Sequence, residues 1–326
     1  MASPPLGILV VPGAAHVAIV DLLRRDCREL GLEARILCAD PEPEWSACAR
    51  LADLSLPIGP LGEPGFADEL AGICRDHDVR LVIPLSDEVL PALAAIRDDL
   101  AGRGVLAAVS SPQAVRTARD KALTATALKA ARLNAPATVL GADFVHDPDM
   151  GPMVVKPRIG SGSEGVRVVA SRRDFEAALE AEGDCVVQPL VIGPEYTVNF
   201  FVDPDGRCRA AVPHLRHEVR AGKVSKASTA RIAALIDAAA GVAAAIPGAF
   251  GPWCYQAILT DEGPVIFEVN ARLSAGYAIA DRAGARFTRW LIELALGRTP
   301  AFHNDWTDEV WMIWFDQMLS GEGRLA

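Results

Sequence analysis

The first third of the chain alternates short apolar segments with amphipathic ones, and this order restricts the possible folds more than any other feature. Residues 7–11, Gly-Ile-Leu-Val-Val, predict a buried strand, and apolar residues at helical spacing over 17–30 predict a helix after it. The alternation continues with strands predicted at 33–38, 80–84 and 105–109 and helices predicted at 66–76 and 87–100. Strands and helices in series predict a parallel sheet covered by helices on both faces.

The pattern changes from about residue 110. Ser111 and Pro112 supply an N-cap and a first-turn proline for a predominantly helical segment predicted over 112–133. Short strands joined by turn-forming residues follow, with helices predicted at 172–182 and 230–245 among them. The predicted strands are 153–157, 166–170, 185–189, 196–202, 209–213, 253–259 and 264–270. This second part is therefore predicted to be α+β, with mostly antiparallel sheets.

A loop rich in glycine and serine follows the strand at 153–157, which carries Lys156. Its residues are Gly160, Ser161, Gly162, Ser163 and Gly165. Glycines let backbone N–H groups approach phosphate oxygens, serine hydroxyls can donate, and Lys156 adds a positive charge, so the segment can wrap a polyphosphate. It is neither a Walker loop nor a dinucleotide fingerprint, because no Gly-Lys-Ser/Thr ends it and a strand rather than a helix follows. The loop alone is also compatible with a flexible hairpin.

A second candidate segment runs from an apolar strand into a Gly-Pro turn before Glu195. The backbone of Gln188, Pro189, Leu190 and Val191 could hydrogen-bond an adenine ring, and Glu195 could accept hydrogen bonds from ribose hydroxyls. The alternative is a surface connection between strands with a solvated Glu195.

Polar residues alternate with apolar ones along the strand at 264–270. The period of two places Glu268, Asn270 and Arg272 on one face, and Gln256 on the neighbouring predicted strand faces the same way. Oxygen ligands of this kind suit Mg²⁺, and the arginine can hold an anionic intermediate. The alternative is an exposed sheet face with polar residues by chance.

These segments follow one another in a particular order: Lys121 within Arg119-Asp-Lys121, Lys156 with its glycine loop, Gln188 to Glu195, then Gln256 and Glu268-Val-Asn-Ala-Arg272. In this order they resemble the ATP-grasp superfamily over nearly the whole chain, and most closely the branch that includes the carbamoyl-phosphate synthetase large-subunit repeat. The resemblance implies an α/β lobe at 1–110, a central subdomain with a lid at 111–190 and a C-terminal subdomain with the metal site at 191–326. ATP would lie between the two antiparallel sheets.

The resemblance also implies roles for individual residues. Lys121 and Lys156 would contact phosphates, Gly160 to Gly165 would form the lid, and Glu195 would bind ribose. Gln256, Glu268 and Asn270 would surround two Mg²⁺ ions, for which Mn²⁺ can substitute.

The basic segment 214–226 is similar to the one that leads from the nucleotide to the acceptor site in this family. Arg216 and Lys226 are its candidates for the acyl-transfer step, and the alternative is two cations on an exposed edge strand and turn. His214 and His217 alternate along a strand, which argues against a histidine metal site.

The implied activity is an ATP-dependent carboxylate–amine ligase that forms an amide or peptide bond through an acyl phosphate and releases ADP and phosphate. Amino acids are the expected substrates. A bicarbonate-activating carboxylase or carbamoyl-phosphate-like synthase would use the same nucleotide site and stays open. So does a non-catalytic nucleotide sensor, although such a protein would be expected to lack the lysines or metal ligands.

The segment Ile83-Pro-Leu-Ser-Asp-Glu88 ends a predicted strand of the parallel sheet, where ligands of such sheets collect. Its polar residues could help define the carboxylate substrate. Alternatively, Asp87 and Glu88 are a helix N-terminal pair that is favourable to the helix dipole.

Composition limits the partners. A net charge of −10 argues against nucleic acid or an anionic membrane as a partner. No stretch approaches the roughly 20 apolar residues that span a bilayer, and the seven cysteines are scattered, which favours reduced thiols in a cytoplasmic protein. The aromatic-rich segment Trp306 to Phe315 could cover the core or a partner, and we expect a homodimer.

Overall fold

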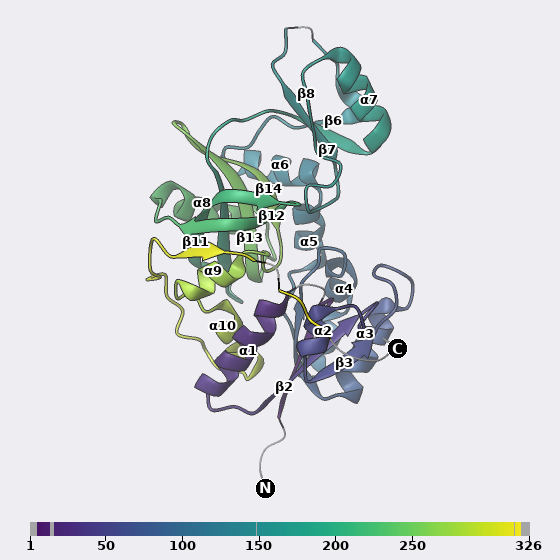
Figure 1. The fold of residues 1–326 in the computed structure, drawn as a ribbon, viewed down its shortest axis with the longest axis vertical. Helices are drawn as coiled ribbons and strands as arrows, with labels where there is room; N and C mark the ends of the chain where they lie inside the picture. Colours follow the sequence, from purple (N-terminus) through teal and green to yellow (C-terminus); the bar gives the residue numbers. More distant parts are fainter. Residues whose placement is uncertain (1–4, 14–15, 148, 316, 321–326) are drawn as a thin grey trace.

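The computed structural model describes residues 5–13, 16–147, 149–315 and 317–320, which form three sheets (Figure 1). The N-terminal sheet consists of β1 (Leu6–Val11), β2 (Ala34–Asp40), β3 (Leu54–Pro57), β4 (Val79–Pro84) and β5 (Leu106–Ala107). All of its pairings are parallel, in the order β3-β2-β1-β4-β5. The predicted parallel sheet is therefore confirmed.

Helices of this N-terminal lobe are α1 (Val17–Glu29), α2 (Ala47–Leu51), α3 (Phe66–Asp76) and α4 (Leu90–Gly102). α2 and β3 were not predicted, because elements of five and four residues are too short to show a period. α4 begins three residues later than predicted. The residues before it form a turn in which the Ser86 hydroxyl accepts a hydrogen bond from the N–H of Glu88.

The predominantly helical segment predicted over 112–133 is confirmed. Two helices occupy this range, α5 (Pro112–Arg119) and α6 (Lys121–Ala130), because Asp120 between them has an extended backbone. The Asp120 carboxylate caps α6 by accepting hydrogen bonds from the N–H groups of Ala122 and Leu123, at 2.9 and 3.2 Å. The break places Lys121 in the first turn of α6.

The central sheet consists of β6 (Val139–Leu140), β7 (Met153–Pro157), β8 (Arg167–Val169) and β9 (Cys185–Pro189). Its order is β6-β9-β7-β8, all pairings are antiparallel, and α7 (Arg172–Glu182) covers one face. The lobe has a small core of its own, made of Val155, Val169, Phe175, Ala178, Cys185 and Val187. In Figure 1 this lobe projects from one end of the molecule, beyond α6.

The third sheet consists of β10 (Glu195–Val202), β11 (Cys208–Arg220), β12 (Lys223–Thr229), β13 (Gly251–Thr260), β14 (Gly263–Asn270) and β15 (Trp311–Ile313). Its order is β14-β13-β10-β11-β12-β15, and every pairing is antiparallel, as predicted. β11 extends seven residues beyond the predicted end at Pro213, because it forms a long hairpin with β12 that turns at Ala221 and Gly222.

The six-stranded sheet shares its cores with the N-terminal lobe. α8 (Ala233–Ala245) packs on β10, β11 and β14, while α10 (Phe287–Ala295) packs on both β4 and β13. Phe200 and Trp253 belong to one cluster with Leu9 of β1, and Phe201 and Trp290 belong to another with Ile8. The two lobes are therefore joined through continuous hydrophobic cores.

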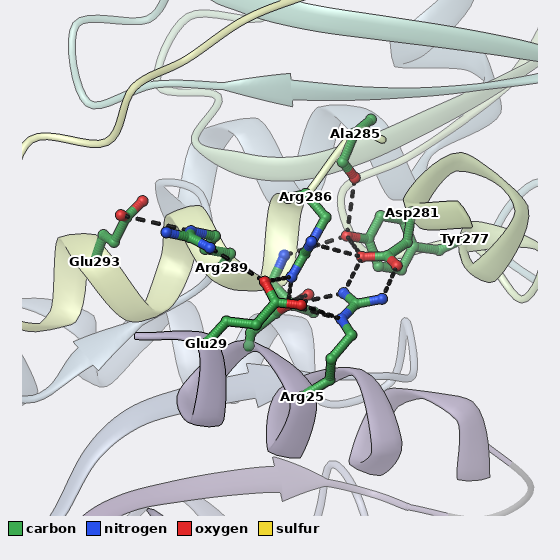
Figure 2. Close-up of polar contacts among 10 residues, drawn as sticks. Arg25, Glu29, Tyr277, Asp281, Ala285, Arg286, Arg289 and Glu293 are labelled. Atoms are coloured by element: carbon green, nitrogen blue, oxygen red, sulfur yellow. Dashed lines mark hydrogen bonds and ion pairs between the residues drawn. The ribbon is translucent and has the colours of Figure 1, made fainter. Parts of the chain in front are cut away.

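Ion pairs reinforce this joint between α1 and the segment of α9 (Tyr277–Arg282) and α10 (Figure 2). Arg25 donates to both carboxylate oxygens of Asp281, at 2.6 and 2.8 Å. Arg286 bonds Asp26, which is buried, and Glu29, which is exposed, the latter at 2.7 Å. The network fixes the N-terminal lobe against the C-terminal part of the chain.

The aromatic-rich C-terminal segment divides in two. Trp306 is buried and covers the core, whereas Trp311, Trp314 and Phe315 are exposed, Trp311 to 71%. None of the helices in the described parts of the chain is long and apolar enough to cross a membrane. All seven cysteines are free, and six of them are buried.

Candidate active site

A cavity of about 590 Å³ lies where the three lobes meet. The central sheet and the six-stranded sheet form two of its walls, and the connection between β4 and α4 forms a third. The residues predicted for the site line this cavity, except Gly165 and Lys226. Segments separated by as much as 260 residues in the sequence are thus brought to one place.

One row of polar residues crosses four strands of the six-stranded sheet at the wall of the cavity. Glu268 of β14 is opposite Gln256 of β13, Gln256 is opposite Thr197 of β10, and Thr197 is opposite His214 of β11. Directly opposed residues share a face of a sheet, and all four line the cavity. The period-two argument therefore placed Gln256 and Glu268 correctly on one face.

The side chains of the predicted metal ligands lie together and bond one another. The Asn270 amide nitrogen donates to the side-chain oxygens of Gln256 and Glu268, both at 3.1 Å. One carboxylate and two amides are hard donors of the kind that Mg²⁺ takes together with phosphate oxygens, so the donor set fits this ion. No group of three His, Cys, Asp or Glu side chains in the described residues could hold a metal, so a cation here would depend on the amides and on ligand oxygens.

Two buried lysines line the same cavity as these three predicted metal ligands, which we call the metal set. Lys121 of α6 donates to the Gly160 carbonyl at 2.9 Å, and Lys156 of β7 donates to the Phe267 carbonyl at 3.1 Å. Burial, together with the nearby charge of Lys121, lowers the pKa of Lys156 to about 8, although Glu268 opposes this shift. Burial also lowers the pKa of Lys121, although Glu268 and Asp87 oppose it. Two cations held this close without enough counter-charge are prepared for an anionic ligand.

The glycine loop between β7 and β8 lies against the β11–β12 turn. Gly162 and Gly222 both have positive φ, 71° and 72°, and a Cβ atom on Gly222 would overlap the carbonyl oxygen of Gly162. Gly165 instead packs against Glu182 and Pro157 of its own lobe, which explains why it does not line the cavity. The loop thus closes one side of the cavity through a backbone contact that only glycine permits at position 222.

We expect Gly222→Ala to hold this loop away from the turn, because the added methyl group has no room. Trypsin should then cleave several-fold faster at Arg158 or Arg167, which flank the loop, since cleavage reports local opening. Gly206→Ala is the matched control, because Gly206 also has positive φ, 78°, but no atom within 4 Å of its missing Cβ. Equal cleavage rates in the two variants would show that the contact does not hold the loop.

Arg216 is bonded to Glu195, the residue predicted to bind ribose. Its guanidinium forms an ion pair with Glu195 and donates to the Gly222 carbonyl at 2.8 Å. It therefore connects the end of β10 to the turn on which the loop rests. Lys226 lies outside the cavity, exposed and paired with Glu218 at 2.5 Å.

Residues of the predicted adenine slot form one edge of the cavity. Gln188, Pro189, Leu190 and Val191 line it in sequence at the end of β9. The Gln188 side chain is buried and donates to the Thr138 hydroxyl at 2.8 Å, so it stabilises the slot through its side chain. The predicted backbone contacts to adenine stay a prediction.

Sequence reasoning missed His16 and Lys223, which line the cavity near Arg272. Burial, then Arg272 and then Lys223, lower the pKa of His16 to about 4, so this imidazole is neutral near pH 7. Lys223 takes the place in the cavity that was expected for Lys226. Gly222, between the apolar Val219 and Val224, is the sequence signal that could have placed the hairpin turn and with it Lys223.

The wall beside Arg272 contains a buried polar chain of three residues. The Ser274 hydroxyl donates to the side-chain oxygen Oδ1 of Asn199 at 2.6 Å, and the side-chain nitrogen Nδ2 of Asn199 lies 3.3 Å from Nδ1 of His214. Burial, with a further contribution from Arg216, lowers the pKa of His214 to about 3. This histidine is therefore a neutral part of the wall.

Comparison with protein families finds two matches that together span most of the chain. Residues 118–276 match the ATP-grasp domain, and residues 8–108 match the PylC-like N-terminal domain. The first range contains the two lysines, the glycine loop and the metal set.

Enzymes with a named activity are similar to this chain over a short stretch of sequence or in fold at low identity. D-alanine–D-alanine ligase from Corynebacterium aurimucosum is 38% identical over 66 residues, which is 19% of this chain and 18% of that protein, so the match spans under a fifth of the relative. L-amino acid ligase from Bacillus licheniformis has a similar fold, with a TM-score of 0.71 and 19% identity over 90% of this chain and 75% of that one. The biotin carboxylase domain of Hydrogenobacter thermophilus 2-oxoglutarate carboxylase gives 0.71 and 17%, over 95% and 74%.

Proposed function

Since residues 118–276 are an ATP-grasp domain and residues 8–108 a PylC-like N-terminal domain, we propose that this chain is an ATP-dependent ligase that joins a carboxylate to an amine. The carboxylate would be activated as an acyl phosphate, and ADP and phosphate would be released. The observation that carries this proposal is the convergence of Gln256, Glu268 and Asn270 opposite two buried lysines, in a cavity closed by a glycine loop.

In the first step a carboxylate oxygen of the substrate attacks the γ-phosphorus of ATP, and the bond to the β-phosphate oxygen breaks. Lys121 and Lys156 neutralise the charge that moves onto the departing ADP oxygen, so catalysis is mostly positioning and electrostatics. Mg²⁺, when bound by Glu268, Asn270 and Gln256, supplies further positive charge against the phosphates. We propose two such ions and expect Mn²⁺ to substitute.

In the second step the amine nitrogen attacks the acyl carbon, phosphate leaves, and the nitrogen loses a proton to give the amide. Arg272 lines the cavity beside the metal set and is the candidate that holds the acyl phosphate. The glycine loop would exclude water, which otherwise hydrolyses the intermediate. Glu195, held by Arg216, would bind the ribose at the other end of the cavity.

Amino acids are the proposed substrates. The L-amino acid ligase and the D-alanine–D-alanine ligase among the relatives act on such molecules by name. The wall from the N-terminal lobe supplies Ser86, Asp87 and Glu88 to the cavity, which can contact polar groups of a small substrate.

Carboxyphosphate chemistry is the second candidate, because a relative of the same fold is a biotin carboxylase domain in complex with MgADP and bicarbonate. It differs only in the activated group. A sensor without catalysis is disfavoured, because both lysines and all three oxygen ligands face the cavity.

ADP release measured with ATP and Mg²⁺ across single and paired amino acids, other small carboxylates, and bicarbonate with ammonia tests the proposal. We expect release that requires both a carboxylate and an amine, with mass spectrometry detecting their amide. Release with bicarbonate alone would support the second candidate. No release with any member of the panel would contradict both.

We propose that the enzyme works in the cytoplasm, where ATP is available and its seven free cysteines stay reduced. A homodimer is proposed because Trp311 and Ile313 are exposed on β15, at the edge of the six-stranded sheet.

A further inference from the structure

Asp87 of the N-terminal lobe bonds Arg272, the arginine that lines the cavity beside the metal set. Both Nε and Nη2 of Arg272 donate to the same carboxylate oxygen of Asp87, at 2.9 and 2.5 Å. The two side chains are largely buried, 15% and 13% exposed, and lie 185 residues apart in the sequence. This contact joins the end of β4 to the end of β14 across the cavity.

The contact uses one edge of the guanidinium and leaves another edge free to bind a ligand. Arginine has five N–H groups, one on Nε and two on each terminal nitrogen. Asp87 accepts from two of them, and the Leu273 carbonyl accepts from one on Nη1 at 3.1 Å. One N–H therefore remains on each terminal nitrogen, and these can donate to a carboxylate or phosphate.

We propose that Asp87 is a positioning residue that aims this free edge of Arg272 at the oxyanion of the acyl phosphate, an inference that rests on the function proposed above. Because the guanidinium is planar and rigid, fixing one edge fixes the direction of the other. Asp87 is itself held in place, since its lobe is joined to the six-stranded sheet by shared cores and by the ion pairs of α1. The N-terminal lobe thereby completes the acyl-transfer site.

Burial of Arg272 makes this partner necessary. A charged guanidinium that is only 15% exposed needs a counter-charge beside it, and the Asp87 carboxylate supplies one. Asp87 does not take the place of a substrate carboxylate, because it occupies the Nε edge and an N–H on each terminal nitrogen stays free beside the Leu273 contact. The same carboxylate raises the pKa of Lys121 from a distance, so it also lies within electrostatic range of the phosphate site.

The test titrates inorganic phosphate into the full chain saturated with Mg·ADP, for the wild type, Asp87→Ala, Asp87→Asn and Arg25→Gln. We expect Asp87→Ala to weaken phosphate binding by about tenfold or more, because a charge-assisted contact is lost. Asp87→Asn should weaken phosphate binding less than Asp87→Ala does, since its amide oxygen can still accept from Arg272 although the charge is lost. The Mg·ADP affinity, which also reports folding, should change by less than about twofold in each variant.

Arg25→Gln is the matched control for the joint between the lobes, because Arg25 bonds Asp281 outside the cavity. It should leave phosphate affinity unchanged. If it weakens phosphate as much as Asp87→Ala does, the effect belongs to the joint and the inference is overturned. Phosphate binding by Asp87→Ala that equals or exceeds that of wild type, or no binding by wild type, also overturns it. Failure of the ligase proposal would show differently, as no ADP release with any substrate of the panel.

Discussion

Replacement of Glu268 by glutamine should reduce ADP release by roughly a thousandfold, the order seen when a charge-stabilising group is removed from an active site. Glu268 is the only carboxylate of the metal set, and its partners Gln256 and Asn270 are neutral amides. Glutamine keeps the size of the side chain but removes the negative charge that a divalent cation requires. Nucleotide binding should survive in weaker form, because Lys121 and Lys156 remain.

Glu262→Gln is the matched control for this measurement. Glu262 lies at the turn between β13 and β14, is exposed, and does not line the cavity. Its replacement should leave ADP release within about twofold, as surface substitutions usually do. Chelation of Mg²⁺ should abolish release in both the wild type and this control. Full activity of Glu268→Gln would remove the metal assignment.

Replacement of Lys156 by methionine should have two opposite effects, loss of nucleotide binding and a gain in stability. Lys156 is 4% exposed, and without a ligand its charge is carried in a cavity wall beside Lys121. Methionine has a similar length and is apolar, so it removes the cost of burying that charge. We expect the affinity for Mg·ATP to fall by about a hundredfold, because a direct contact between a buried cation and phosphate is worth several kcal/mol at most.

The sign of the stability effect follows from the pKa of Lys156, which is lowered from 10.5 to about 8 in the folded chain. Between these values the unfolded chain binds more protons, so the unfolding free energy of the wild type should rise with pH through this window. Below about pH 8 the buried charge of Lys156 lowers the unfolding free energy by its full amount, on the order of 3 kcal/mol. Lys156→Met should therefore be more stable than wild type at pH 7, and this advantage should shrink as the pH rises above 8.

Urea denaturation of the nucleotide-free protein at pH 7 and pH 9.5 measures the stability effect, and titration with Mg·ATP measures the affinity, with Lys129→Met as control. Lys129 lies in the last turn of α6 and is exposed, so its replacement should change the unfolding free energy little at either pH. Lower stability of Lys156→Met at pH 7, or unchanged affinity for Mg·ATP, would contradict the roles assigned to this lysine.

The sequence predicts those parts of the site that depend on local periodicity. Glu268 and Gln256 face one cavity because side chains alternate along strands, and both residues lie well inside long strands. Lys156 and the glycine loop were likewise found because a strand leads directly into the loop. For these residues the local pattern and the tertiary structure agree.

Other parts depend on contacts between distant segments or on the exact position of a turn. Asp87 and Arg272 meet only when the first and third sheets pack together, and no local pattern reports this. That Lys223 rather than Lys226 lines the cavity depends on where the β11–β12 hairpin turns, which Gly222 alone indicates in the sequence. The break at Asp120 was missed because its flanking residues continue a helical pattern, while its own carboxylate starts a new helix.

The separate, small core of the central lobe has a consequence for how ligands enter and leave. Six buried side chains hold this lobe together, whereas the remainder of the chain shares two much larger clusters. The free energy of opening should therefore be lowest here, and its amide hydrogens should exchange with solvent before those of the other two sheets. Substrate turnover can then proceed by fluctuations of the least cooperative unit, while the scaffold that positions Arg272 stays intact.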